Sequence, residues 1–246
     1  MSLEIALLLF AGGLAAGVFN TLAGGGSIVS VPLLVLAGLP GTVANGTNRV
    51  GIFAQSATAA LRFRAQGVSG FRGSLPVLLP VGLGSLIGAL VIANVADETF
   101  ERLFGILMVA LLIPIVWQPR STGARPARRW PPAVSFAVFL VIGLWGGAFQ
   151  AGVGIALVIA LSYAGYDLVS ANSIKVVVNA LLTAVALPVF LLHRQIMWLP
   201  GLALAAGYAL GGELGARLAV RGGERLIRPV LVAGVLVLAG RMMGIY

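Results

Sequence analysis

Long stretches without a charged side chain set the strongest limit on what this chain can fold into. Residues Ala133 to Tyr166, Ser74 to Ala96 and Leu103 to Gln118 contain no Asp, Glu, Lys or Arg. About 20 consecutive apolar residues span the hydrocarbon core of a bilayer as a helix. Charged residues make up 9% of the chain, whereas soluble domains average about 25%. The sequence therefore predicts an all-α, multi-pass membrane protein.

The apolar residues fall into two sets of five segments. The first set covers residues 3–23, 27–39, 42–66, 74–96 and 100–117, and the second covers 132–152, 155–166, 168–192, 196–220 and 226–244. A stretch rich in Arg and Pro separates the two sets. We therefore expect a first transmembrane repeat at 1–117, a basic linker loop at 118–130 and a second transmembrane repeat at 131–246.

The two sets share short sequence patterns in the same order. Gly13-Leu-Ala-Ala-Gly17 corresponds to Gly143-Leu-Trp-Gly-Gly147, and Gly84-x-x-x-Gly88 corresponds to Gly211-x-x-x-Gly215. Ala44-Asn45 likewise matches Ala171-Asn172, with nearly the same separation along the chain. Chance matches would not share one register, so we expect two homologous halves.

Each half contains one segment that is too short to cross a bilayer. Residues 27–39 and 155–166 form about 18 Å of helix, against a hydrocarbon core of about 30 Å. They follow Gly24-Gly25-Gly26 and Gly152-Val153-Gly154, where an unbroken helix is unfavourable. Paired short helices after glycine breaks point to the binding site of a transporter. The alternative is that these glycines only allow close helix packing.

The direction of the two halves depends on the short segments. If they cross the membrane, the halves are inverted, and the basic stretches at 62–72, 118–130 and 217–228 share one side. If they are re-entrant, each half has four spans and the halves run parallel. Basic loops concentrate on the cytoplasmic side, which favours the inverted arrangement and explains the net charge of +9 without nucleic acid binding.

Two cations, Arg49 and Lys175, lie inside apolar stretches at nearly equivalent places in the two halves. A cation at the centre of a membrane helix costs about 2.5–3.5 kcal/mol and usually faces a cavity or a partner. Two of them at matching depths predict a site for an anion. The alternative is that each reaches a lipid headgroup or an acidic side chain.

Neutral polar residues and glycines near the cations complete the candidate substrate site. They are Asn20, Gly25, Gly26, Asn45, Thr47, Asn48, Gln150, Asn172, Ser173 and Asn179. Amides and hydroxyls hold an oxyanion without neutralising the cations, and helix starts near Thr42 and Asp167 would add backbone amides. Taken singly, each polar residue more often serves as an interhelical hydrogen bond.

Glu213 is the one acid within an apolar run of the second half. It is a candidate for a protonatable coupling site, or it pairs with Arg217 four residues later, which we favour slightly. The chain has no cysteine and one histidine, and no motif suggests a metal site, a cofactor or an enzyme. Ser27 as a protease nucleophile would need an oriented base, and His193 lies in the other half.

The stretch GGLAAGVFNTLAGGGSIVSVPLLVLAGLPGTVANGTNRVGIFAQSATAALRFRAQG resembles the sulfite exporter TauE/SafE family, and so does SANSIKVVVNALLTAVALPVF. The resemblance covers nearly the whole chain. It implies a multi-pass transporter of the bacterial inner membrane that exports sulfite, organosulfonates or related sulfur anions. The family's glycine break matches Gly24 to Gly26, its polar element matches Gly46-Thr47-Asn48, and its second-half lysine matches Lys175.

The sequence thus predicts a secondary transporter of a small sulfur oxyanion that is embedded in lipid. The alternatives are an anion channel without coupling and a membrane scaffold that transports nothing. The GxxxG faces would mediate a homodimer or pack within one chain.

Overall fold

The structure, a computed structural model, describes residues 1–110 and 130–242. For residues 108–110 and 223–242 it describes the backbone alone. This part of the chain is helical. Its elements are α1 (Leu3–Leu22), α2 (Ser27–Leu36), α3 (Gly41–Ala65), α4 (Phe71–Ala93), α5 (Asp97–Ala110), α7 (Pro132–Ala148), α8 (Val153–Tyr163), α9 (Leu168–Leu192) and α10 (Trp198–Met242). The expectation of an all-α, multi-pass membrane protein is confirmed.

Three of the described helices are long and apolar enough to cross a membrane, namely α1, α4 and α9. The helices α2 and α8 contain 10 and 11 residues, so they are as short as the sequence predicts. The expected break between 220 and 226 is wrong, because α10 continues through it. An interrupted helix in lipid would leave backbone groups without partners, at several kcal/mol each, whereas a helical glycine costs only about 1 kcal/mol.

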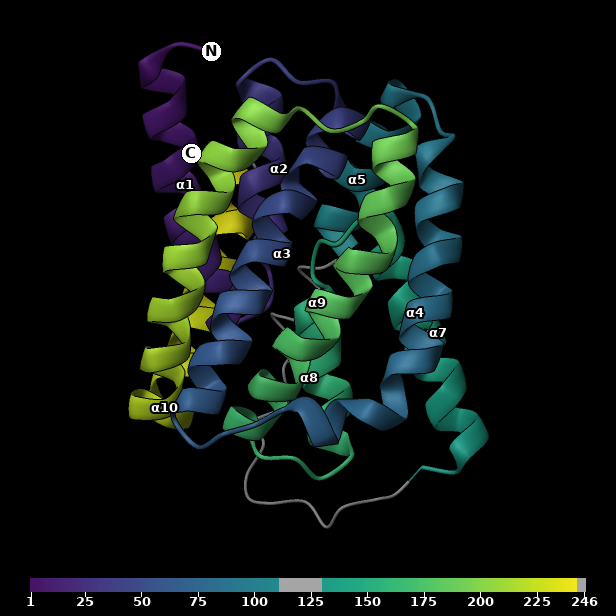
Figure 1. The fold of residues 1–246 in the computed structure, drawn as a ribbon, viewed down its shortest axis with the longest axis vertical. Coiled ribbons are helices and arrows are strands. Elements are labelled where there is room, and N and C mark those ends of the chain that lie inside the picture. Colours follow the sequence, from purple (N-terminus) through teal and green to yellow (C-terminus); the bar gives the residue numbers. More distant parts are fainter. Residues whose placement is uncertain (111–129, 243–246) are drawn as a thin grey trace.

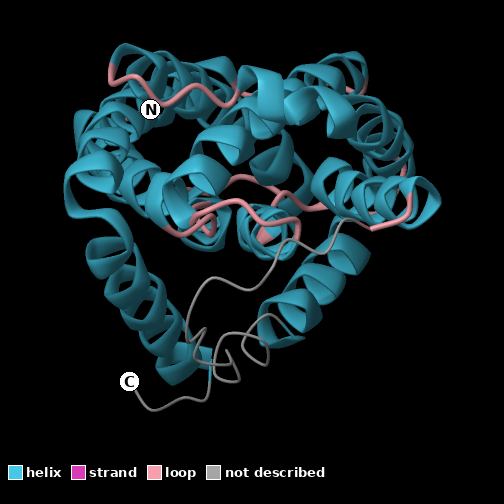
Figure 2. Cartoon of the chain, turned by 90° about the horizontal axis from the view of Figure 1, so that it is seen from below, coloured by secondary structure: helices cyan, strands magenta, loops and turns pink. Residues whose placement is uncertain are grey.

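The helices associate into two bundles (Figure 1). The first bundle consists of α1, α2, α3 and α10, and the second of α4, α7, α8 and α9. The bundles meet chiefly where α3 packs against α9. Each bundle therefore combines helices from both expected halves of the sequence. The view from below (Figure 2) shows connecting loops in the middle of the molecule between helices seen nearly end-on.

Glycines bring the helix pairs α1–α10 and α4–α7 into backbone contact. A Cβ atom added to Gly13 would lie 2.4 Å from the carbonyl oxygen of Leu204, and one added to Gly147 would lie 2.0 Å from that of Ser85. Small residues spaced four apart allow this approach between membrane helices. The glycine motifs thus pack across the two expected halves. The helix α1 of the first half lies against α10 of the second, and α7 of the second half lies against α4 of the first.

The paths of α1–α2 and α7–α8 run in opposite directions. In Figure 1, α1 begins at the upper end, and the connection from α2 to α3 lies at that same end. The helix α7 begins at the lower end, where α8 also connects to α9. Each pair therefore enters the molecule and returns to the side it came from. The full-length helices α3 and α9 then run antiparallel to each other.

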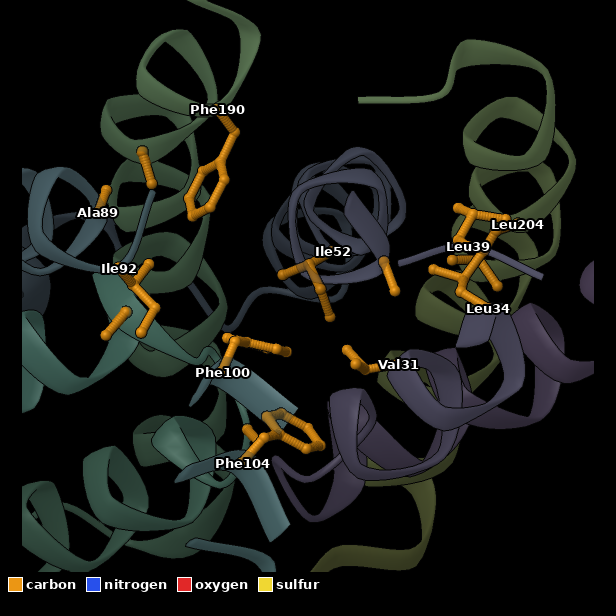
Figure 3. Close-up of a cluster of buried hydrophobic side chains, with 14 of the residues drawn as sticks. Val31, Leu34, Leu39, Ile52, Ala89, Ile92, Phe100, Phe104, Phe190 and Leu204 are labelled. Carbon is orange, nitrogen blue, oxygen red and sulfur yellow. The ribbon is translucent and has the colours of Figure 1, made fainter. Parts of the chain in front are cut away.

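An apolar cluster joins α2, α3, α5 and α9 (Figure 3). Phe100 and Phe104 of α5 stack with ring centroids 5.5 Å apart, next to Val31 of α2, and Ile52 of α3 and Phe190 of α9 belong to the same cluster. All five side chains are buried. This cluster fixes α5 and α2 against α3, so that the N-terminal half of α3 is held in place.

Candidate functional site

The two glycine breaks contact each other at the centre of the molecule. A Cβ atom added to Gly24 would lie 2.3 Å from the carbonyl carbon of Gly154, and one added to Gly154 would lie 2.4 Å from the Cα atom of Gly24. Gly24 also has a φ of +92°, and Gly152 one of +73°, a region that favours glycine. The contact gathers the C-terminal ends of α1 and α7 and the N-terminal ends of α2 and α8.

Arg49 of α3 binds the C-terminal end of α7 in the other bundle. Its terminal nitrogens donate to the carbonyl oxygens of Gly146 (3.2 Å), Gly147 and Ala148 (3.2 Å) and to Oε1 of Gln150 (3.2 Å). The guanidinium lies 4.4 Å from the centre of the Phe190 ring, and the residue is fully buried. The last carbonyls of a helix have no partner within it and carry partial negative charge, so Arg49 completes this helix end.

Lys175 of α9 does the same for α1. Its Nζ donates to the carbonyl oxygens of Asn20 (2.9 Å) and Thr21 (2.7 Å) and to Oδ1 of Asn172 (2.6 Å). These three bonds use all the protons of an ammonium group, and the residue is fully buried. Each long helix therefore holds the broken helix of the other expected half.

Two matched asparagines support the same helix ends. The amide nitrogen of Asn45 donates to the carbonyl oxygen of Ala148 (2.8 Å), and that of Asn172 donates to the carbonyl oxygen of Leu22 (3.5 Å). Their oxygens differ. Oδ1 of Asn172 accepts from Lys175, whereas Oδ1 of Asn45 has no partner among the described residues.

A polar network surrounds the break between α1 and α2. Oδ1 of Asn20 accepts from the backbone N–H of Gly26 (3.2 Å), which explains the need for this residue beside the glycines. Oδ1 of Asn48 accepts from the Ser30 hydroxyl (2.6 Å), and its amide nitrogen donates to Ser27 (3.0 Å). The structure thus brings Asn20, Gly26 and Asn48 together, as expected from the sequence.

Three members of this network were not expected from the sequence: Ser30, Gln55 and Tyr208. Asn20 donates to Gln55 (2.7 Å), and the hydroxyls of Ser30 and Tyr208 lie 2.7 Å apart. Gln55 follows Asn48 by seven residues and so lies on the same helix face. Helical periodicity could therefore have predicted that Gln55 belongs to the network. Tyr208 had no such signal, because nothing in its own segment shows that it reaches the break.

Thr47 and Ser173 lie away from the breaks, contrary to the grouping that the sequence suggested. The Thr47 hydroxyl accepts from the backbone N–H of Met197 (3.0 Å), next to the connection between α9 and α10. The Ser173 hydroxyl donates to the carbonyl oxygen of Val68 (3.0 Å), in the connection between α3 and α4. Both hydroxyls hold loops at opposite ends of the molecule.

The start of α3 is not open to an anion. The carboxylate of Asp97 already accepts from the backbone N–H (2.9 Å) and the hydroxyl (2.6 Å) of Thr42. At the start of α9, Asp167 accepts from the backbone N–H groups of Val169 and Ser170 (both 3.0 Å). Carboxylates therefore occupy the helix starts that the sequence offered as anion donors, and the breaks remain as the central feature.

Glu213 binds Arg217 four residues later, so the local pair that we favoured is present. Its side chain is 39% exposed, unlike the buried acid that the apolar run suggested. Ser27 contacts Asn48, whereas the ring of His193 lies against the carbonyl oxygen of Val189. No three His, Cys, Asp or Glu side chains cluster for a metal ion in the described part of the chain.

The electrostatics of the centre are dominated by the two cations. Among the buried residues that the structure describes, Arg49 and Lys175 are charged and none is acidic. The helix ends offset this charge only in part, since each contributes about half an elementary charge. The Nε of Arg49 also has no partner among the described residues. The centre of the described structure therefore carries an excess of positive charge.

Comparison with known proteins identifies the family of this chain. The sequence pattern of the family described as "Sulfite exporter TauE/SafE" matches residues 9–242. The chain belongs to this family. A "Probable membrane transporter protein" of Haemophilus influenzae is 27% identical over 99% of this chain and 96% of its own length. The "Probable membrane transporter protein ORF9" of a Sinorhizobium species is 28% identical over 99% of this chain and 94% of its own length. No solved structure matches.

The family resemblance expected from the sequence is thus confirmed, and the chain is a multi-pass member of a transporter family. A further relative, the "Probable membrane transporter protein YfcA" of Escherichia coli, is 25% identical over 96% of this chain and 88% of its own length. The match extends across both glycine breaks and both cations, so the central features lie within the part shared with these relatives.

Proposed function

We propose that this protein is a secondary transporter that exports small sulfur-containing oxyanions, such as sulfite or organosulfonates, across the bacterial inner membrane. The observation that carries the proposal is the pair of fully buried cations, Arg49 and Lys175, at the junction of two broken helices. No described buried residue is acidic, so the charge is compensated by helix ends and, in our proposal, by the substrate.

We infer that the chain consists of two homologous halves in inverted orientation. Three matches support this inference: α1–α2 and α7–α8 return to opposite sides (Figure 1), Arg49 and Lys175 each bind the end of the other broken helix, and Asn45 and Asn172 make equivalent contacts. Inverted repeats around a central site are common in secondary transporters. They provide two similar states that open to opposite sides.

The proposed substrate contacts are the donors around the breaks. The set comprises Arg49, Lys175, Asn20, Asn45, Asn48, Gln150, Asn172 and Asn179, with Gly25 and Gly26 letting the backbone approach. An anion at the junction would compete with the helix-end carbonyls for the two cations. Since both cations bridge the two bundles, substrate binding would weaken the contacts that hold the bundles together. Rocking of one bundle against the other would then move the site from one side to the other.

Glu213 remains our candidate for the coupling residue. Its carboxylate is partly exposed and pairs with Arg217. A homodimer through the lipid-facing surface of the chain is a further proposal, to be tested by the mass of the protein in detergent.

The direct test is the thermal stability of the purified protein with sulfite, sulfate, thiosulfate, short sulfonates and carboxylates. Ligand that binds the folded state raises the unfolding temperature, so we expect stabilisation by one sulfur anion and its loss in Arg49→Ala and Lys175→Ala. Flux into proteoliposomes then separates a coupled transporter, which accumulates the anion, from a channel. No shift with any anion and no flux would leave a scaffold and refute the proposal.

A further inference from the structure

The buried surface of α9 between the two cations carries polar atoms without a hydrogen-bond partner in the described part of the chain. Lys175, Asn179 and Thr183 follow one another at intervals of four residues, so they lie on one face of the helix. The three side chains are at most 2% exposed. Oδ1 of Asn179 and Oγ1 of Thr183 have no hydrogen-bond partner in the described part of the chain. Buried polar groups are nearly always paired, so this stretch needs an explanation.

The position of this stretch links the two cations. Phe190 of α9 contacts the Arg49 guanidinium, and it lies seven residues, or two turns, beyond Thr183 on the same face. Lys175 lies two turns before Thr183. Along α9, therefore, Asn179 and Thr183 occupy the levels between the residue that carries one cation and the ring that contacts the other.

The opposing helix α3 also presents polar groups at these levels. Ile52 packs in one cluster with Phe190, and Ala59 packs in another with Val176. Ser56 lies between Ile52 and Ala59 on α3, and its hydroxyl is buried and makes only a long bond (3.3 Å) to Gln55. Between the levels of these two clusters, α3 and α9 thus both carry buried polar groups.

The known contacts of the cations explain why these groups matter. All three protons of Lys175 are donated to helix-end acceptors, and Arg49 keeps only its Nε free of a partner. Besides this Nε, the groups available for a ligand between the cations are the amide of Asn179 and the hydroxyl of Thr183. The Thr183 hydroxyl and the amide nitrogen of Asn179 donate to the oxygens of an anion, whereas Oδ1 of Asn179 only accepts.

We infer that Asn179 and Thr183 form an oxyanion subsite on α9 between Arg49 and Lys175. This inference rests on the proposed function and adds Thr183 as a specificity-determining residue. The substrate class is a small oxyanion whose oxygens accept from a hydroxyl and an amide at once. The positive potential of the cations attracts the anion, and the two neutral donors bind it at close range.

A structural role and a binding role for these residues predict opposite effects on stability. Thr183→Val and Asn179→Leu keep the volume and remove groups that have no hydrogen-bond partner among the residues that the structure describes. If the groups serve the substrate, both variants fold with an unfolding temperature no lower than that of the wild type, while the initial rate of sulfite flux in proteoliposomes falls at least tenfold. Thr58→Val is the matched control, because the Thr58 hydroxyl donates to backbone carbonyls of Ala54 and Ala209, and its flux stays at the wild-type rate.

The outcomes separate the two proposals. If the wild type moves sulfite or methanesulfonate and both variants do so at the same rate, the subsite is refuted while the transporter remains. If the variants unfold several degrees lower and lose flux only in proportion to folded protein, the residues are structural and the subsite is again refuted. If the wild type moves neither anion, the proposed function fails and the subsite with it.

Discussion

The contact between the two helix breaks makes a sharp prediction about Gly154. Gly154→Ala adds one methyl group at a place where the nearest atom, the Cα of Gly24, is 2.4 Å away, with the carbonyl oxygen of Gly24 at 2.8 Å. Both are backbone atoms that no rotamer change can move. The breaks would have to separate by about 1 Å, at a typical overpacking cost of 1–3 kcal/mol or more.

Gly24→Ala combines the same clash with an unfavourable backbone conformation. Its Cβ would lie 2.3 Å from the carbonyl carbon of Gly154, and its φ of +92° adds about 1–2 kcal/mol for an L-residue. We expect Gly24→Ala to lower the free energy of unfolding by about 2–5 kcal/mol. At about 2–4 °C per kcal/mol for a chain of this size, the unfolding temperature falls by about 10 °C.

Two glycines provide matched controls that separate these effects. Gly38 has a φ of +94° and no described atom within 4 Å of an added Cβ, so Gly38→Ala reports the backbone cost alone. Gly105 lies in α5, has no positive φ, and has no described atom within 4 Å of an added Cβ. Gly105→Ala therefore raises the free energy of unfolding by about 0.5–1 kcal/mol, because alanine favours the helix over glycine.

The assay is thermal unfolding of the four variants in detergent, followed by tryptophan fluorescence and by the amount of monodisperse protein. The expected order of stability, from highest to lowest, is Gly105→Ala, the wild type, Gly38→Ala and Gly24→Ala, with Gly154→Ala below the wild type. A Gly154→Ala protein as stable as Gly105→Ala would show that the breaks do not touch, and the central site would lose its geometric basis.

Three further predictions concern charged groups at helix ends. Lys175→Met removes three hydrogen bonds, each worth about 0.6 kcal/mol on average in membrane proteins, so thermal unfolding should show a loss of about 2 kcal/mol that Lys175→Arg partly avoids. Asp97→Ala removes the carboxylate that caps α3 at Thr42 and should cost about 1 kcal/mol in the same assay. Burial alone would raise the pKa of Asp167, but the hydrogen bonds from Ser170 and Val169 outweigh it and hold that pKa below its usual value. The carboxylate therefore stabilises the fold above the pKa of the unfolded state and this contribution is lost as pH falls through the folded pKa. Unfolding temperatures measured on acidification should fall less steeply in Asp167→Asn than in the wild type.

Local signals in the sequence were sufficient for the helices and the breaks. Hydropathy marks the segments because lipid selects apolar side chains along a whole span, and glycine runs mark breaks because they are the residues that tolerate a positive φ. The burial of Arg49 and Lys175 was also predictable, since each stands alone in an apolar stretch. In each case the relevant physics acts within about ten residues.

The partners of these residues were not predictable from local patterns. Arg49 binds a carbonyl 97 residues away and Lys175 one 155 residues away, and backbone oxygens leave no mark in the sequence. The carboxylate of Asp97 reaches Thr42 across 55 residues, so helix starts that looked open are filled. Only the assembled bundles decide which of several acceptors a buried cation meets.

The placement of the cations limits how this protein can change conformation. Arg49 lies in the first bundle and binds α7 of the second, whereas Lys175 lies in the second and binds α1 of the first. Any motion of one bundle against the other must therefore stretch both sets of bonds or replace their acceptors. A small oxyanion supplies replacement acceptors for both cations, and an apolar or cationic solute supplies none. Under our proposal, the substrate anion thus offsets the energy that opposes motion of the bundles, and no acidic residue at the centre is required.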